Sequence, residues 1–407
     1  MAVLENFRIK LIKMKLEASQ RVKELGSYAF ADVDNEVAKL KAAGITPIDF
    51  GVGDPKDPTP AIIRNYTKRA LDKRKSSGYP SYIGSQEFRE EVAAWTKKRF
   101  EVELDPNKEV CSNIGAKEAV FHFPLGFVNP GDYVLMPNPG YPPYERGTTF
   151  AGGKAHFMNL LAENNFLPKL DVIPAEIVKK AKILWLNYPN NPTTAVATKE
   201  FYKEAVDFCH DNNIILASDE PYTENYYDEK NKPLSALNIS KEGVVVFQSL
   251  SKRSNMTCYR VGWVAGDENI ISVFKKVKTN IDSGTCTFIQ DSAIAALSDE
   301  VHVDQFRRDY KIKRDLIIRA LTSAGLENCA PKGTIYIWQK TPKGMSSVEF
   351  AKKLLQKDVA IVTTPGSWIS KEINGVNPGE GYVRFALVPT IAECKVAAER
   401  LRRLRFK

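Results

Sequence analysis

Short apolar runs alternate with amphipathic stretches through the middle of the chain, and this pattern sets the expected architecture. The stretch 199–211 shows the spacing of an amphipathic helix. Because strands separated by helices build helix-covered parallel sheets, we expect an α/β fold with a largely parallel sheet. In such sheets, ligands bind at the carboxyl ends of the strands. The expected strands are 133–136, 182–187, 214–218, 244–248 and 261–265.

The pattern changes at about residue 300, where a long charged helix at 301–324 is followed by more strands and a terminal helix. We therefore expect residues 1–60 to form an N-terminal arm and part of a small domain. Residues 61–298 would form a large cofactor-binding domain, and residues 299–407 a smaller α+β domain. The strands expected in this last part are 335–339, 359–362 and 382–387.

The composition is that of an ordinary globular protein, with 43% hydrophobic and 26% charged residues among 407. No apolar run reaches the ~18 residues of a membrane span. Residues 1–21 carry Glu5 and Glu17, so they lack the uninterrupted apolar core of a secretion signal. We therefore expect a soluble, cytoplasmic protein without a membrane partner.

The net charge of +9 comes from 58 basic and 49 acidic residues, and part of it lies in the basic segment 400–407. This segment could be a tail for nucleic acid or an anionic membrane. The spacing of Leu401 and Leu404 instead favours the last turn of a helix, where basic residues suit the helix dipole. We therefore expect no nucleic-acid partner. The six cysteines form no C-x-x-C pair and the four histidines lack metal-ligand spacing, so we expect no metal site.

One lysine is a candidate nucleophile. Lys252 follows the apolar run 244–247, lies among small hydroxyl residues, and precedes Arg260 by eight positions. A crowded lysine near fixed cations loses its proton readily, and the neutral amine is nucleophilic.

An acid and a tyrosine follow the strand expected at 214–218. Asp219 there is costly unless it is paired. A protonated pyridine nitrogen would pair with it and keep a pyridine cofactor an electron sink. Tyr222 and Asn191 could donate hydrogen bonds to the phenolic oxygen of such a ring. The alternatives are a helix N-cap for Asp219 and an ordinary turn for the Asn-Pro-rich run 187–193.

A glycine turn and several polar side chains could bind a phosphate. The stretch 113–118 places Gly115 before an apolar helix, whose N-terminus offers free N–H groups and a positive dipole end. Together with Ser249, Ser251 and Arg260 this turn could form a phosphate cup. A lysine, an acid, a tyrosine and an arginine are the parts needed to hold pyridoxal phosphate.

Two further side chains fit the same ligand. Tyr141 follows the strand expected at 133–136 and could stack on a ring, although a lone aromatic more often serves packing. Arg384 lies on an apolar strand, so it needs a carboxylate partner. That partner is either the α-carboxylate of a substrate, held by two parallel hydrogen bonds, or an acid of the protein in a structural salt bridge.

Taken together, these motifs resemble the class I and II aminotransferases, which are fold-type I pyridoxal phosphate enzymes. The resemblance runs from about residue 28 to the C-terminus, and the ordered set is more specific than any one motif. The motifs are 51–55, Tyr79 with Gly84 and 87–89, 115–117, 187–193, Asp219 with Tyr222, 249–260 and Arg384.

The resemblance implies a role for each residue around the cofactor ring. Lys252 would bond covalently to the cofactor and later move the proton in a ping-pong transfer of an amino group. Asp219 would pair with the pyridine nitrogen, and Tyr222 and Asn191 with the phenolic oxygen. Tyr141 would stack on the ring.

The resemblance also implies how the phosphate and the substrate are held. Gly53 and Arg384 would bind the α-carboxylate of an amino acid or a 2-oxo acid. Tyr79 would reach the phosphate of a neighbouring subunit, which implies a homodimer with shared active sites. The phosphate would be bound by Ala116, Lys117, Ser249, Ser251 and Arg260.

The stretches 28–34, 51–60 and 249–260 are similar to the LL-diaminopimelate aminotransferases, which make LL-diaminopimelate and 2-oxoglutarate from tetrahydrodipicolinate and glutamate in lysine biosynthesis. Two positions depart from the family pattern, because Thr194 and Cys258 stand where the family usually has glycine.

Other functions stay open. Closely similar motifs occur in aspartate, alanine and aromatic amino acid aminotransferases, and the same scaffold supports a C-S β-lyase. A regulatory protein that binds the cofactor without turnover is a further alternative. It would need a helix-turn-helix domain, and only about 27 residues precede the resemblance.

Overall fold

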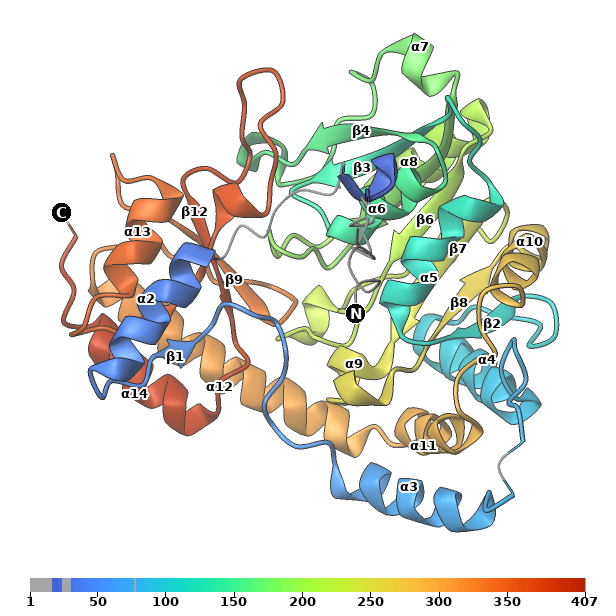
Figure 1. The fold of residues 1–407 in the computed structure, drawn as a ribbon, viewed down its shortest axis with the longest axis horizontal. Coiled ribbons are helices and arrows are strands. Elements are labelled where there is room, and N and C mark those ends of the chain that lie inside the picture. Colours follow the sequence, from blue (N-terminus) through green and yellow to red (C-terminus); the bar gives the residue numbers. More distant parts are fainter. Residues whose placement is uncertain (1–16, 24–30, 77, 407) are drawn as a thin grey trace, which may run out of the picture.

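A seven-stranded sheet forms the centre of the larger part of the molecule (Figure 1). The structure is a computed structural model and describes residues 17–23, 31–76 and 78–406. The strand order is β2-β8-β7-β6-β5-β3-β4, and only β8 runs against the other six. The strands are β2 (Val110–Asn113), β3 (Tyr133–Asn138), β4 (Lys154–Asn159), β5 (Ala181–Asn187), β6 (Ile215–Asp219), β7 (Val244–Ser249) and β8 (Gly262–Gly266).

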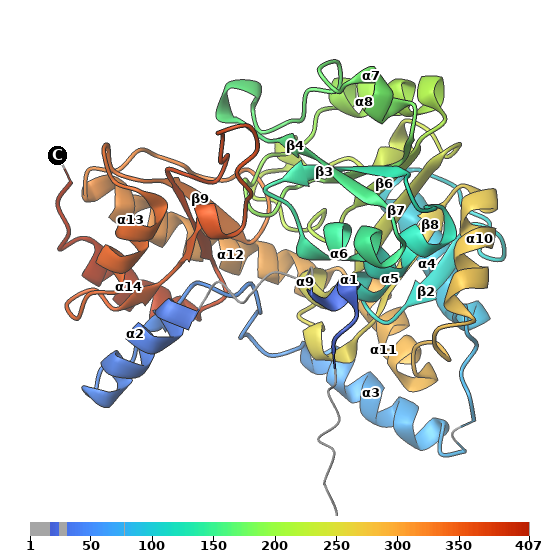
Figure 2. The same ribbon diagram turned by 45° about the horizontal axis from the view of Figure 1, so that its top comes forward.

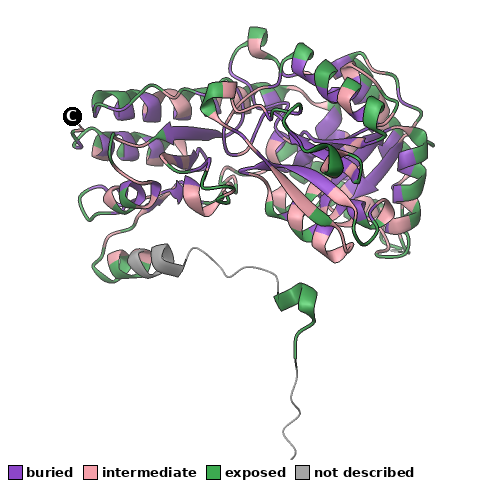
Figure 3. Ribbon diagram, turned by 90° about the horizontal axis from the view of Figure 1, so that it is seen from above, coloured by how far each residue is buried: buried purple, intermediate pink, exposed green. Residues whose placement is uncertain are grey.

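Helices cover both faces of this sheet, which explains why its strands are almost continuously apolar. In β5, Ile183 and Trp185 enter one core with α5, α6 and α10, whereas Leu184 and Leu186 enter another with α4, α8 and α11. Figure 3 shows the resulting concentration of buried residues in the sheet. The helices are α3 (Ala61–Lys73), α4 (Gln86–Phe100), α5 (Ala116–His122), α6 (Pro142–Phe150), α7 (Ala175–Val178), α8 (Lys199–Asn212), α9 (Leu250–Arg253), α10 (Glu268–Lys278) and α11 (Thr287–Ser298).

Two smaller sheets pack with the C-terminal helices around a third core. One is antiparallel, with the order β11-β12-β9, and the other pairs β1 with β10 in parallel. In Figure 2, α12 begins beside α11 and ends among these sheets. The elements are β1 (Ile48–Asp49), β9 (Tyr336–Lys340), β10 (Ile361–Val362), β11 (Thr364–Pro365), β12 (Tyr382–Ala386), α12 (Val301–Ser323), α13 (Ser347–Leu354) and α14 (Ile391–Leu401); α1 (Gln20–Lys23) and α2 (Ala31–Ala42) precede them.

The expected α/β fold with a largely parallel sheet is confirmed, and three details differ. The sequence pattern did not predict β2 or β4, and the strand expected at 359–362 is reduced to β10. The terminal helix ends at Leu401, although Leu401 and Leu404 are both buried as the packing interpretation requires. The domain boundaries remain a prediction, and residues 28–30 of the N-terminal motif lie outside the described residues. Within the described ranges, the search for a long apolar helix able to span a membrane finds none.

Candidate active site

A cavity of about 450 Å³ opens where the central strands end. Asn187 ends β5, Asp219 ends β6 and Ser249 ends β7, and all three line the cavity. Tyr336 of β9 and Arg384 of β12 line it from the antiparallel sheet. The cavity therefore lies at the edge where parallel sheets bind ligands. Its walls come from the seven-stranded sheet and from the antiparallel sheet β11-β12-β9, whose strands lie later in the sequence.

The structure brings nearly all of the predicted site residues to this cavity. Tyr79 is the exception, because its side chain is 87% exposed and does not line the cavity. The predicted residues that line the cavity are Gly53, Ala116, Lys117, Tyr141, Asn191, Asp219, Tyr222, Ser249, Ser251, Lys252, Arg260 and Arg384.

Lys252 is half-buried in α9, and its Nζ donates a hydrogen bond to the carbonyl of Gly53. Desolvation by the surrounding protein is the main reason that its pKa falls from 10.5 to about 8. Arg384 and Arg260 lower the pKa further, whereas Asp54 opposes them. The amine is thus partly neutral near physiological pH, as a nucleophile or a general base requires.

Asp219 is a buried carboxylate with one satisfied oxygen. Its Oδ2 accepts a hydrogen bond from the Tyr144 hydroxyl at 2.6 Å, whereas Oδ1 has no hydrogen-bond partner among the described residues. Burial raises the pKa of Asp219 to about 7, and the bond from Tyr144 offsets part of that rise. An N–H group arriving from the cavity would satisfy Oδ1, and a protonated pyridine nitrogen supplies such a group. The acceptor on Asp219 that is unpaired among the described residues therefore fits the ring of pyridoxal phosphate.

Arg384 connects the two walls of the cavity. Its Nη1 donates to Asn191 Oδ1 at 2.9 Å and its Nη2 to the carbonyl of Gly51 at 2.8 Å, whereas its buried Nε has no hydrogen-bond partner among the described residues. The guanidinium carbon lies 4.7 Å from the ring centroid of Tyr336, whose hydroxyl is 3.0 Å from that of Tyr222. Asn191 and Tyr222 thus already have protein partners that a ligand would share or replace.

The residues predicted to form a phosphate cup lie together at the N-terminus of α5. Gly115 adopts a φ of 75°, and a Cβ added there would lie 2.4 Å from a guanidinium nitrogen of Arg260. Glycine at this position therefore lets the arginine approach the turn. Ser249 Oγ donates to Ser251 Oγ at 2.9 Å, so the two hydroxyls face the same space. Free N–H groups, hydroxyls and an arginine converge there, and this combination suits an anion.

Three of the residues that line or support the cavity and were not assigned from the sequence are Tyr336, Asn187 and Tyr144. Tyr336 lies close enough that a Cβ on Gly53 would come within 2.1 Å of its hydroxyl, so a larger residue at position 53 would displace the Tyr336 ring. Asn187 lines the cavity and donates from Nδ2 to the carbonyl of Asp219 at 2.7 Å, and Tyr144 supports the carboxylate of Asp219. A polar or aromatic residue near a strand end was the only signal for each of them.

One of the two departures from the family pattern has a visible consequence for the backbone. Thr194 adopts a φ of 65°, the left-handed region that β-branched residues avoid, so a position usually held by glycine is strained here. Cys258 is exposed in a 3₁₀ turn at Thr257–Tyr259, directly before the phosphate-cup arginine.

Comparison with known sequences places this geometry in a family. The family model described as aminotransferase class I and II matches residues 45–401. An LL-diaminopimelate aminotransferase of Aquifex aeolicus (strain VF5) is 45% identical over 393 residues, covering 96% of this chain and 100% of that protein. LL-diaminopimelate aminotransferase 2 of Trichormus variabilis is 45% identical over 382 residues, covering 93% of this chain and 95% of its own.

Solved structures agree with this placement. An aminotransferase from Neisseria meningitidis has a TM-score of 0.87 and 35% identity, covering 94% of this chain and 98% of that chain. A single mutant of Thermus thermophilus aspartate aminotransferase has a TM-score of 0.86 and 25% identity, covering 96% and 100%. The similarity thus includes the residues that line the cavity, the seven-stranded sheet and the two smaller sheets.

Proposed function

The chain belongs to the aminotransferase class I and II family and is a pyridoxal phosphate-dependent transaminase, and we propose that it transfers an amino group between LL-diaminopimelate and 2-oxoglutarate. The observation that carries the substrate is the nearly full-length similarity to LL-diaminopimelate aminotransferases. With these substrates, the enzyme would act in lysine biosynthesis.

The ring is held, in this proposal, by groups that lack a protein partner or can exchange one. Asp219 Oδ1 would accept a hydrogen bond from the pyridine nitrogen, and Tyr141 lines the cavity where the ring would bind. Tyr222 and Asn191 would hold the phenolic oxygen. The cofactor would supply a reactive aldehyde and an electron sink for the charge that remains when the α-proton leaves. Lys252 would anchor the cofactor, and its neutral amine would move the α-proton.

The substrate α-carboxylate is assigned to Arg384 and the backbone at Gly53. The guanidinium of Arg384 carries two N–H groups that contact Asn191 and Gly51, and an Nε for which the described residues offer no hydrogen-bond partner. A carboxylate can accept two parallel hydrogen bonds from this planar group. This contact places the α-carbon of the substrate on the side of the cavity where Lys252 lies.

We assign the phosphate to the turn before α5. The backbone N–H groups of Ala116 and Lys117 are at the helix N-terminus, where the dipole favours an anion. Ser249, Ser251 and Arg260 complete the cup.

We also propose a cytoplasmic homodimer with shared active sites. Tyr79 is 87% exposed, and the nearby helix α3 exposes Ile62, Tyr66 and Leu71. Apolar surface of this kind favours contact with another chain. In a dimer, Tyr79 would contact the phosphate of the partner, which explains why it does not line the cavity of its own chain.

The substrate is tested by half-reactions of the purified holoenzyme with single amino acids. We expect LL-diaminopimelate and glutamate to bleach the yellow absorbance of the cofactor with higher kcat/KM than aspartate, alanine or phenylalanine. Bleaching by glutamate together with aspartate, but not by LL-diaminopimelate, would retain the transaminase and remove the substrate assignment. Release of pyruvate and ammonia from a cysteine conjugate without any 2-oxo acid would indicate β-elimination instead.

A further inference from the structure

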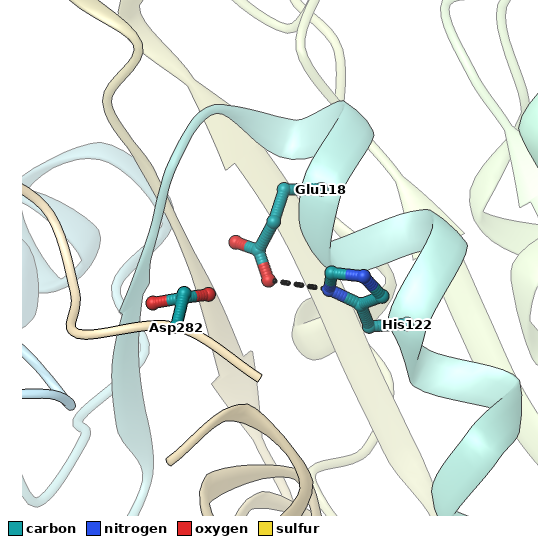
Figure 4. Close-up of side chains that lie close together, drawn as sticks. All are labelled: Glu118, His122 and Asp282. Carbon is teal, nitrogen blue, oxygen red and sulfur yellow. Dashed lines mark hydrogen bonds and ion pairs between the residues drawn. The ribbon is translucent and has the colours of Figure 1, made fainter. Parts of the chain in front are cut away.

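A cluster of ionisable side chains lies behind the phosphate turn, outside the cavity. Glu118 and His122 project from α5 toward Asp282, which follows α10 (Figure 4). One potential ligand atom from each of these residues lies within 4.8 Å of the others, an arrangement that could hold a metal ion. A fourth residue, Lys278, determines how this cluster is used.

The ammonium group of Lys278 occupies the position between the two carboxylates. Its side chain is fully buried, and its Nζ lies 2.8 and 2.9 Å from the two oxygens of Asp282 and 3.3 Å from Glu118 Oε2. An ammonium group has three N–H donors, and here it has three carboxylate oxygens as acceptors. The lysine thus supplies the positive charge that a metal ion would otherwise bring.

Hydrogen bonds connect this cluster to the turn on both sides. Glu118 Oε2 also accepts from the backbone N–H of Ile114 at 2.9 Å, directly before Gly115. On the other side, Asp282 Oδ1 accepts from the N–H of Gly284 at 2.7 Å. The next residue, Thr285, donates from its hydroxyl to the carbonyl of Asn113 at 2.9 Å. Residues 113 and 114 are therefore held from two directions by groups that Lys278 joins.

The charges of the cluster keep Glu118 able to accept the hydrogen bond from Ile114. Burial alone would raise the pKa of Glu118, but the bonds and charges of His122, Lys278 and the Ile114 amide lower it below its usual value. Glu118 is therefore ionised at neutral pH and is a fixed acceptor for Ile114 N–H. Without Lys278, two partly buried carboxylates would repel each other, and one would move or take up a proton.

We propose that Lys278 is a positioning residue for the cofactor phosphate, acting through Glu118 and the loop that contains Asp282 to hold the turn 113–117 in its anion-binding shape. The inference rests on the placement of the phosphate proposed above. Its action is local, because the ring contacts lie elsewhere, with Asp219 at the end of β6 and Tyr222 in the turn after it. Loss of the lysine therefore weakens binding of the phosphate group and leaves the binding of the ring unchanged.

The test compares two ligands that differ only in the phosphate. The dissociation constants of pyridoxal phosphate and of pyridoxal are measured on cofactor-free protein, for wild type and for Lys278→Met. We expect the constant for pyridoxal phosphate to rise about tenfold, the scale seen when outer partners of a bound group are removed. The constant for pyridoxal stays at the wild-type value.

Two further variants keep the test decisive if Lys278→Met folds poorly. Thr285→Val removes only the hydrogen bond to Asn113 and is expected to shift the same ratio by a smaller factor. In the double variant Lys278→Met, Asp282→Asn, only the carboxylate of Glu118 loses its cation, so the fold is less disturbed. This variant should still bind pyridoxal phosphate more weakly than wild type. Lys313→Met is the matched control, because Lys313 is also buried and paired with an acid, Asp57, but lies away from the turn.

The outcomes separate this inference from the proposed function. Equal losses for both ligands, or no loss for either, would show that Lys278 has only a structural role and would overturn the inference alone. A wild-type protein that binds pyridoxal as tightly as pyridoxal phosphate would overturn the phosphate placement and the inference with it. A shift of the ratio in Lys313→Met equal to that in Lys278→Met would also contradict a local role.

Discussion

The surroundings of Lys252 and of Lys278 differ although both lysines are enclosed by protein. Lys252 has a backbone carbonyl as its hydrogen-bond acceptor, and burial together with two nearby arginines lowers its pKa to about 8 despite the charge of Asp54. Lys278 has two carboxylates within 3.3 Å of its Nζ. Burial alone therefore does not make a lysine reactive. A buried lysine that is hydrogen-bonded to no acid among the described residues, such as Lys252, has a lowered pKa, because desolvation and the two arginines outweigh the opposing charge of Asp54.

The acids of the two regions differ in the same way. Asp219 is buried beside a hydroxyl and carries an oxygen without a partner among the described residues, so burial raises its pKa to about 7. Glu118 has a cation, a histidine and an amide N–H, and its pKa is lowered despite burial. The cavity thus holds polar groups that lack partners until a ligand binds, whereas the cluster behind the turn is complete by itself.

The largest expected effect concerns the chemical role of Lys252, which Lys278 does not share. Lys252→Ala should lower the rate of the glutamate half-reaction on the order of 10⁴-fold, because both the covalent attachment and the proton transfer are lost. Stopped-flow absorbance with glutamate measures this rate. Lys203→Ala, an exposed lysine of α8 paired with Asp207, is the control and should retain the wild-type rate. A Lys252→Ala variant with wild-type turnover would remove the mechanism.

The next effect concerns the free energy of unfolding, which replacement of Lys252 and replacement of Lys278 should change in opposite directions. In cofactor-free protein at pH 7, Lys278→Met should lower the free energy of unfolding by up to about 3 kcal/mol, because it leaves two partly buried carboxylates without their cation. Lys252→Met should instead raise it by roughly 1–2 kcal/mol, because a charged amine no longer has to be enclosed. The Lys252 difference should disappear as pH rises from 8 to above 10.5, where the amine is neutral in both states.

Denaturant unfolding of the three proteins measures both changes. Destabilisation of similar size in both variants would mean that the two lysines have the same structural role, and the distinction drawn from their partners would then be wrong.

The sequence predicted the chemistry of the cavity better than its walls. Asp219 and Lys252 were recognisable because charged residues directly after apolar strands of a parallel sheet gather at one edge. Tyr336 was not, since it lies on an apolar strand of another sheet, and its approach to Gly53 depends on how the two sheets pack. β4 was missed because only one of its six residues is buried, so no apolar run marks it.

The cluster behind the turn was also beyond sequence reasoning. Glu118 and His122 have helical spacing, but Lys278 and Asp282 are about 160 residues away, and an ion pair at that separation leaves no local pattern. The resemblance to a known family supplied roles for the cavity residues only. The contacts of Lys278 exist because α5 and α10 pack on the same face of the sheet.

The smallest expected effect tests the acids, and its sign differs between the regions. The raised pKa of Asp219 means that the folded state keeps a proton up to about pH 7 that the unfolded chain loses near pH 4, so this contribution to stability is lost as pH rises. In cofactor-free protein, Asp219→Asn should therefore be more stable than wild type at pH 8 by roughly 1–3 kcal/mol, and the difference should shrink toward pH 4.

Glu118→Gln should show the opposite sign. Because the pKa of Glu118 is lowered, its ionised form stabilises the fold above about pH 4.5, and that contribution is lost as pH falls further. The glutamine still accepts from Ile114 N–H but no longer balances Lys278, so the variant should be less stable than wild type at pH 8. Unfolding of both variants at pH 5 and pH 8 measures the pair. If the ionised forms of both acids stabilised the cofactor-free protein at pH 8, Asp219 would already be paired within the protein. Its carboxylate would then not need the ring nitrogen of a cofactor as a hydrogen-bond donor.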